Sequence, residues 1–172
     1  MTIYDIMPLI EEIVVKVRKR ILERYPESAL DNYYGQCNRA SMMFFVYLTK
    51  KLEDMTLNEA ANMCLDIPGI YCFHDINYMV TKTMTDICAE RINIKLVHGE
   101  QAHTPEIDES EWYMEHTWVE ISLYDDPTII YVDCTSGQFK YLYNDIPDYY
   151  ISTEKPRWYL ADRDNPEFAR KD

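Results

Sequence analysis

The chain has 172 residues, of which 47% are apolar and 13% aromatic, so it can bury a core and is too apolar to be disordered over most of its length. Its 17 basic and 30 acidic residues give a net charge of −13, which repels phosphate backbones and anionic membranes. These values argue against nucleic-acid and membrane partners. No apolar run reaches the length of a membrane span, and the N-terminal residues do not resemble a signal peptide. We therefore expect one domain over residues 1–172, in a protein made in the cytoplasm.

The cysteines do not form a recognisable framework. They are an odd number at irregular spacings, with no C-x-x-C pair, which argues against a set of disulfides: Cys37, Cys64, Cys72, Cys88 and Cys134. Cys72 and His74, with His98 or His103, supply ligand types that zinc accepts, but their spacing fits no structural zinc pattern. We expect no metal and no other cofactor.

The first third of the chain is predicted to be helical. Apolar residues recur at helical spacing over residues 4–24, and Tyr25-Pro26 ends this helix. Residues 27–36 are polar and contain a glycine, so they are predicted to form a loop. A second amphipathic pattern begins at Cys37 and continues to about Leu52.

The middle of the chain changes from helical to extended patterns. A capping-box signature predicts a short helix over 56–64, and a helix-period run follows over 76–91. Residues 92–98 alternate as a strand does, whereas residues 99–111 are polar and are predicted to form a loop or flap beside the site. The charged tail, 162–172, is predicted to fray.

Two further runs, His116–Leu123 and Thr128–Asp133, flank a turn signal and predict a β-hairpin. The register that puts apolar residues on one face pairs Thr117 with Val132, Val119 with Ile130 and Ile121 with Thr128, and on the other face His116 with Asp133 and Trp118 with Tyr131. Directly opposed side chains have Cβ atoms about 5 Å apart, so a carboxylate could reach the imidazole. Helices followed by strands predict an α+β fold, with N-terminal helices packed on a small antiparallel β-sheet.

Cys37 is the candidate nucleophile, because a helix start beside an imidazolium lowers the pKa of a thiol. The first-turn N–H groups, and the amide of Gln36, could donate to an oxyanion. Each residue alone has an ordinary alternative, since Cys37 and His116 could be core residues and Asp133 could cap a turn. Together they fit a Cys–His–Asp triad.

The sequence here resembles the papain-like and transglutaminase-like cysteine enzymes. The matching segments are Gly35-Gln36-Cys37 followed by a helix with Ser41, His116-Thr117-Trp118-Val119-Glu120, and Val132-Asp133-Cys134-Thr135-Ser136-Gly137-Gln138-Phe139. The resemblance implies that Cys37 is the nucleophile, His116 the base and acid, and Asp133 the orienting carboxylate. Cys134 departs from the pattern, since proline is usual there.

The resemblance implies a single papain-like/transglutaminase-like domain that transfers an acyl group from a protein or peptide amide, as a peptidase or a glutamine deamidase. The alternatives are a transglutaminase and an inactive binding module that retains the fold. Four residues are candidates for an oxyanion donor or for support of the triad: Gln36, Trp118, Glu120 and Gln138. For two of them we also weigh sheet packing (Trp118) and a solvated strand position (Glu120). The oligomeric state stays open, and delivery to a host cell as an effector is one hypothesis for where the protein acts.

Overall fold

The computed structural model describes residues 2–50, 65, 92–102, 113–123, 126–140, 145–156 and 159–160. Its elements are α1 (Ile3–Arg24), η1 (Pro26–Ala29), α2 (Cys37–Lys50), β1 (Ile92–Ala102), β2 (Tyr113–Leu123), β3 (Asp126–Asp133), η3 (Ser136–Phe139), β4 (Tyr150–Ser152) and β5 (Tyr159–Leu160). The described part therefore has the predicted α+β arrangement, with helices first and strands after them.

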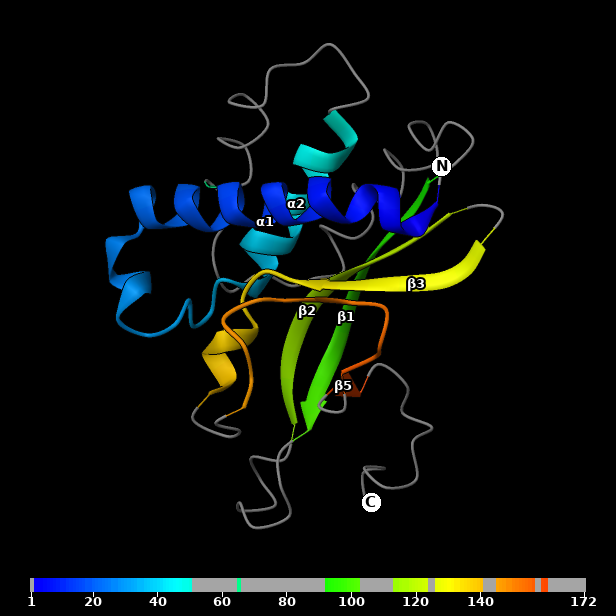
Figure 1. Ribbon diagram of the computed structural model, residues 1–172. Helices are drawn as coiled ribbons and strands as arrows, with labels where there is room; N and C mark the ends of the chain where they lie inside the picture. The colour runs from blue at the N-terminus through cyan, green and yellow to red at the C-terminus, as the bar shows by residue number, and fades with distance from the viewer. Residues whose placement is uncertain are drawn as a thin grey trace.

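The strands form one antiparallel sheet in the order β4-β3-β2-β1-β5. The two longest strands, β1 and β2, pair from end to end, and the short strands β4 and β5 extend the sheet on either side. In Figure 1, α1 crosses α2, and both helices pack against the sheet, α1 at β3 and α2 at β1 and β2. Helices packed on an antiparallel sheet were predicted, and this is confirmed.

The core lies between the two helices and the sheet. Side chains from α1, α2 and the inner face of the hairpin bury completely or nearly so, among them Ile10, Val14, Val17, Ile21, Met43, Phe44, Val119, Ile121, Ile130 and Val132. Burying each aliphatic or aromatic side chain of this kind contributes about 1.5–3 kcal/mol, which makes this core the main source of stability. The helical and strand periods of the sequence match this buried face.

The helix boundaries agree with the sequence. At the start of α1, the backbone N–H and hydroxyl of Thr2 donate to the Asp5 carboxylate at 2.6 and 2.9 Å, which closes a capping box. The helix ends at Arg24, next to Tyr25-Pro26, and α2 begins at Cys37 as predicted. The predicted loop between them contains the short helix η1 and a series of turns.

The strand predicted over 92–98 is longer in the structure, so the prediction of a loop over 99–111 is wrong for its first four residues. Residues 99–102 continue β1, because β2 begins early enough to pair with them along their whole length. Backbone pairing satisfies the N–H and C=O groups of a strand whatever its side chains are, so a polar composition did not reveal this extension. The rest of the predicted loop, 103–111, lies outside the described residues. The helices predicted over 56–64 and 76–91 and the tail 162–172 also lie outside them.

The register of the β2–β3 hairpin differs from the predicted register by two residues. Val119 pairs with Val132, Glu120 with Tyr131, Ile121 with Ile130 and Ser122 with Ile129, so the predicted partners of Thr117, Val119, Ile121 and Trp118 are wrong. Asp126 and Pro127, predicted to be turn residues, belong to β3, and the register shifts between Ser122 and Leu123. Since side chains alternate with a period of two, the shift leaves every residue on its predicted face.

Candidate active site

Cys37 begins α2 after a loop with unusual backbone geometry. Asn32, Tyr33 and Gly35 have φ values of 52°, 65° and 72°, in the left-handed region that non-glycine residues rarely adopt. Tyr33 is held in this conformation by its buried ring and by its N–H, which donates to the carbonyl of Ser28 at 2.9 Å. The loop leaves the Cys37 side chain partly exposed at the first turn of the helix.

The first turns of α2 are bonded to the strand that carries His116. The Ser41 hydroxyl donates to the backbone carbonyl of Thr117 at 3.0 Å in the protein interior. The Thr117 hydroxyl in turn donates to the side-chain oxygen of Asn38. Because Thr117 follows His116 directly, these bonds set the position of the Cys37 end of α2 relative to the histidine.

His116 and Asp133 meet across the hairpin. Nε2 of His116 lies 2.7 Å from Oδ2 of Asp133, and both side chains have an exposed fraction of 0%. Under the observed register the two residues are diagonal neighbours, not directly opposed as predicted. Diagonal positions are still within reach of long side chains, which is why the predicted contact forms despite the two-residue shift.

The carboxylate of Asp133 is oriented by the turn that follows it. Its second oxygen, Oδ1, accepts a hydrogen bond from the backbone N–H of Thr135 at 2.9 Å, while the Thr135 hydroxyl lies 3.4 Å away. This Asx-type turn directs Oδ2 toward His116.

Gln138 connects this turn to the loop before the cysteine. Its amide nitrogen donates to the carbonyl and hydroxyl oxygens of Thr135 at 3.1 and 2.9 Å. Its amide oxygen accepts from the N–H of Gly35 at 3.2 Å. Gln138 therefore bridges the segments that carry Asp133 and Cys37.

The imidazole of His116 carries its proton far more strongly than an ordinary histidine does. Burial lowers the pKa of His116, but the charge and hydrogen bond of Asp133, together with the nearby Cys37, raise it to about 10. The Cys37 thiol thus lies close enough to the ring to influence its protonation. Since Nε2 bonds Asp133, Nδ1 is the nitrogen left to exchange a proton with the sulfur.

Aromatic rings pack around the histidine. Phe139 meets the imidazole edge to face at 4.8 Å between centroids, and Trp118 lies tilted at 6.0 Å. Trp118 is fully buried, and its indole N–H donates to the Glu120 carboxylate at 3.1 Å. Of the roles expected for Trp118, packing in the sheet agrees with this burial. The half-buried Glu120 holds the indole ring through this hydrogen bond.

A hydrogen bond from Arg39 fixes the orientation of the Gln36 side-chain amide. Its side-chain oxygen accepts from the guanidinium of Arg39 at 2.5 Å, so the amide nitrogen is the end that can donate elsewhere. Its backbone oxygen accepts from the N–H of Ala40 at 2.8 Å, which begins the hydrogen bonding of α2. The first-turn N–H groups before Ala40 are the donors that a helix start offers to an anion.

The other described cysteine has a different environment. Cys134 is buried, and burial together with the negative charge of Asp133 raises the pKa of its thiol. Cys134 is therefore an internal standard for an unreactive cysteine beside the same carboxylate.

Three residues that contribute to this arrangement were not singled out from the sequence. They are Asn38, Thr135 and Arg18, whose guanidinium donates to the backbone carbonyl of Cys134 at 2.8 Å. The Asp133-x-Thr135 pattern is a known turn signal and could have identified Thr135. Nothing in the sequence distinguishes Arg18 from the other basic residues at the end of its helix.

Among the described residues, no three His, Cys, Asp or Glu side chains converge as metal ligands do. Cys72, His74 and His103, considered above for zinc, lie outside the described residues. Within the same described ranges, no helix is both long and apolar enough to cross a bilayer.

Comparison of the chain with protein-family models, with curated proteins and with solved structures found no match. Any statement about function therefore depends on the sequence motifs and on the geometry described above.

Proposed function

We propose that the protein is a cysteine hydrolase of the papain-like/transglutaminase-like group, acting on a protein or peptide amide through Cys37, His116 and Asp133. One observation supports this most strongly. A fully buried His116–Asp133 pair, 2.7 Å apart, lies near the partly exposed Cys37 thiol, which begins a helix. A nucleophile, a base that reaches it and a group that orients the base form the arrangement that acyl transfer requires.

The first half of the reaction forms a thioester. The Cys37 thiolate attacks the amide carbonyl carbon, and the carbonyl electron pair moves to oxygen, where the first-turn N–H groups of α2 donate to it. His116 gives its Nδ1 proton to the amide nitrogen. The carbon–nitrogen bond then breaks, and an amine or ammonia leaves.

The second half hydrolyses the thioester. Neutral His116 takes a proton from water at Nδ1, and the oxygen attacks the thioester carbon. The carbon–sulfur bond breaks, which regenerates the Cys37 thiolate beside imidazolium and releases a carboxylic acid. Asp133 keeps the Nε2 proton in place throughout, and Gln138 holds the Asp133 turn against the loop before the cysteine.

For the substrate, the same chemistry accepts either a backbone peptide bond or the side-chain carboxamide of glutamine. The acidic surface, with a net charge of −13, favours protein partners that are basic or neutral. A catalytic thiol must stay reduced, so the proposal includes action in a reducing cytoplasm.

The products distinguish the reaction types. The protein is incubated with a mixture of unfolded, lysine-rich and glutamine-rich polypeptides, with and without a primary amine, and the products are analysed by mass spectrometry. Cleavage identifies a peptidase, conversion of glutamine to glutamate a deamidase, and incorporation of the amine a transglutaminase.

Two matched variants accompany this assay. Cys37→Ala should abolish every product, while Cys134→Ala should retain them if it folds. A folded wild-type protein that forms no product in any mixture, or whose product persists in Cys37→Ala, would contradict the proposed chemistry, and the first of these results would favour the inactive binding module.

A further inference from the structure

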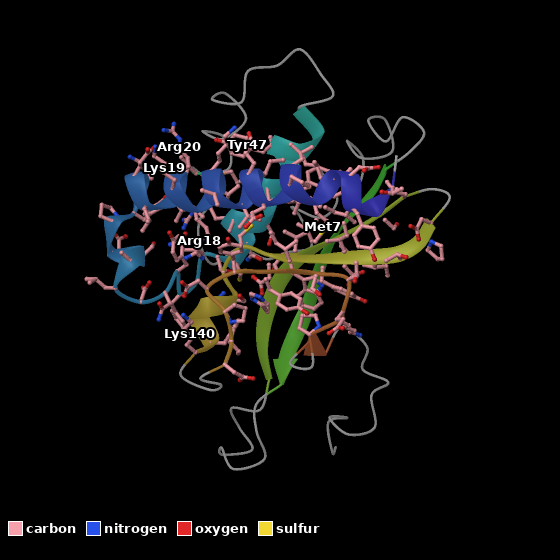
Figure 2. All side chains as sticks on the ribbon, in the orientation of Figure 1. Met7, Arg18, Lys19, Arg20, Tyr47 and Lys140 are labelled. Atoms are coloured by element: carbon pink, nitrogen blue, oxygen red, sulfur yellow. The ribbon has the colours of Figure 1, made fainter. Side chains whose placement is uncertain are left out.

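Arg18, on α1, reaches the candidate site from outside the catalytic motifs. One guanidinium nitrogen donates both to the backbone carbonyl of Cys134 at 2.8 Å and to that of Asp148 at 2.9 Å. Figure 2 shows Arg18 on one side of α1 and its neighbours Lys19 and Arg20 on the other. Arg18 donates to the segment that follows Asp133, whereas Arg20 donates to Glu23 on its own helix at 3.2 Å.

The same guanidinium also contacts the loop that leads to Cys37. It stacks on the Tyr33 ring at 4.0 Å from the centroid, and the Tyr33 hydroxyl donates back to the carbonyl of Arg18 at 3.3 Å. Stacking of this kind is favourable because the cation lies over the electron-rich face of the ring. The Tyr33 carbonyl then accepts from the N–H of Gln36 at 3.0 Å, one residue before Cys37.

Arg18 therefore joins two chain segments that are distant in sequence. Cys134 directly follows Asp133, and Gln36 directly precedes Cys37. The bridge through Arg18 and Tyr33 runs beside the one through Gln138, so the carboxylate segment and the nucleophile segment are connected twice.

We propose that Arg18 is a positioning residue, which holds the Asp133 turn and the loop before Cys37 at the separation that lets His116 bond Asp133 while it stays close to Cys37. This inference rests on the proposed function of the triad. Arg18 itself touches neither the reacting atoms nor the triad side chains, so it acts through Cys134 and Tyr33.

The groups that surround the guanidinium explain why an arginine is required. They are the Tyr33 and Tyr149 rings, the Cys134 and Asp148 carbonyls and the Asp148 carboxylate. The pKa of that carboxyl is lowered mainly by Lys140 and to a smaller extent by Arg18. Two carbonyl acceptors and a stacked ring suit a planar cation. A lysine could still donate to the carbonyls but would lose the planar stacking on Tyr33, and a methionine would lose both interactions.

The test compares Arg18→Met and Arg18→Lys with the matched control Lys19→Met, which removes a charge from the adjacent, exposed position on α1. For each folded protein, NMR follows the titration of the His116 imidazole between pH 5 and 11, and thermal unfolding gives its stability. The histidine titration matters because a purely structural role of Arg18 would lower stability and leave this titration unchanged.

We expect Arg18→Met to lower the pKa of His116 by about one unit or more, since the distances from the imidazole to Asp133 and Cys37 increase. Arg18→Lys should shift it less, and Lys19→Met not at all. If Arg18→Met does not fold, the comparison of Arg18→Lys with Lys19→Met decides. Equal His116 titrations in all folded variants would overturn the proposal.

The two proposals fail separately in this design. Retained product formation in Arg18→Met, with an unchanged His116 titration, would reject the role of Arg18 and leave the cysteine hydrolase intact. If Arg18→Met shifts the His116 titration but the wild-type protein forms no product, the role of Arg18 stands and the cysteine hydrolase is rejected.

Discussion

Asp133 determines which nitrogen of His116 carries a proton, because its carboxylate can only accept from Nε2. Its replacement by asparagine presents an N–H to that nitrogen instead, while the amide oxygen can still accept from Thr135. His116 then holds its proton at Nδ1 and cannot take one from Cys37 or water.

We therefore predict that Asp133→Asn folds but loses about 10³- to 10⁴-fold in kcat, as triads with the wrong tautomer do. Product formation per folded molecule measures this effect. Glu154→Gln, at an exposed carboxylate, is the control and should keep full activity. Equal activity of the two variants would remove Asp133 from the mechanism.

The protonation of His116 also affects stability. Its pKa is about 10 in the folded protein against an ordinary value of 6.5, so the folded state holds the proton more tightly. The stabilisation is fully present below pH 6.5 and is lost as the pH rises toward about 10.

The difference in unfolding free energy between the wild type and His116→Gln should thus decrease over this interval, by at most about 1.4 kcal/mol per pH unit. Urea denaturation at a series of pH values measures it. A difference that is constant with pH would show that His116 titrates normally.

At the residue scale, the contact between His116 and Asp133 could be predicted because both residues lie in short motifs on the two strands of one hairpin. The supporting residues could not. Arg18 bonds a carbonyl 116 positions along the chain, and a cation near a helix end has the same sequence pattern whether it is bonded or solvated.

At the element scale, periodicity was enough for the helices and for the faces of the strands, but not for their lengths or register. A two-residue shift preserves the apolar face, so the pattern of Val119, Ile121, Ile130 and Val132 could not choose between the two pairings. The register depends on which residues form the turn between the two strands, and the turn motif in the sequence does not define them.

The η3 turn, which follows the carboxylate strand, depends on close backbone contact. A Cβ at Gly137 would lie 2.9 Å from the Cα of Asp148, so a side chain there must displace backbone. At Gly35, with φ of +72°, a Cβ would meet nothing within 4 Å, and only the left-handed conformation disfavours a side chain.

We predict that Gly137→Ala destabilises the fold by about 1–3 kcal/mol through overpacking, and Gly35→Ala by roughly 1 kcal/mol through backbone strain. Gly35→Asn should recover part of the second loss, because asparagine tolerates positive φ, while Gly137→Asn should not recover the first. Urea denaturation of the four variants checks this. Equal recovery at both sites would contradict the assignment.

At the scale of the whole molecule, charge and architecture have separate consequences. The α+β arrangement brings together the start of α2 and the ends of β2 and β3, which supply the three side chains. The net charge of −13 acts over a longer range, on the encounter with a substrate.

We expect kcat/KM to be roughly tenfold higher for a lysine-flanked amide substrate than for a glutamate-flanked one at low ionic strength. The ratio should approach one as salt is added, because screening shortens the reach of surface charge. A ratio that does not respond to salt would assign the preference to direct contacts instead of the overall field.

The central claim is that Cys37, His116 and Asp133 work as one unit, and the rate of Cys37 alkylation by iodoacetamide at neutral pH tests it most directly. Mass spectrometry of digested protein resolves Cys37 from Cys134 in the same sample. We predict that Cys37 reacts at least about 100-fold faster than Cys134, and that His116→Gln removes most of this excess without changing the exposure of Cys37. A Cys37 rate that equals that of Cys134, or that is indifferent to His116→Gln, would contradict the account.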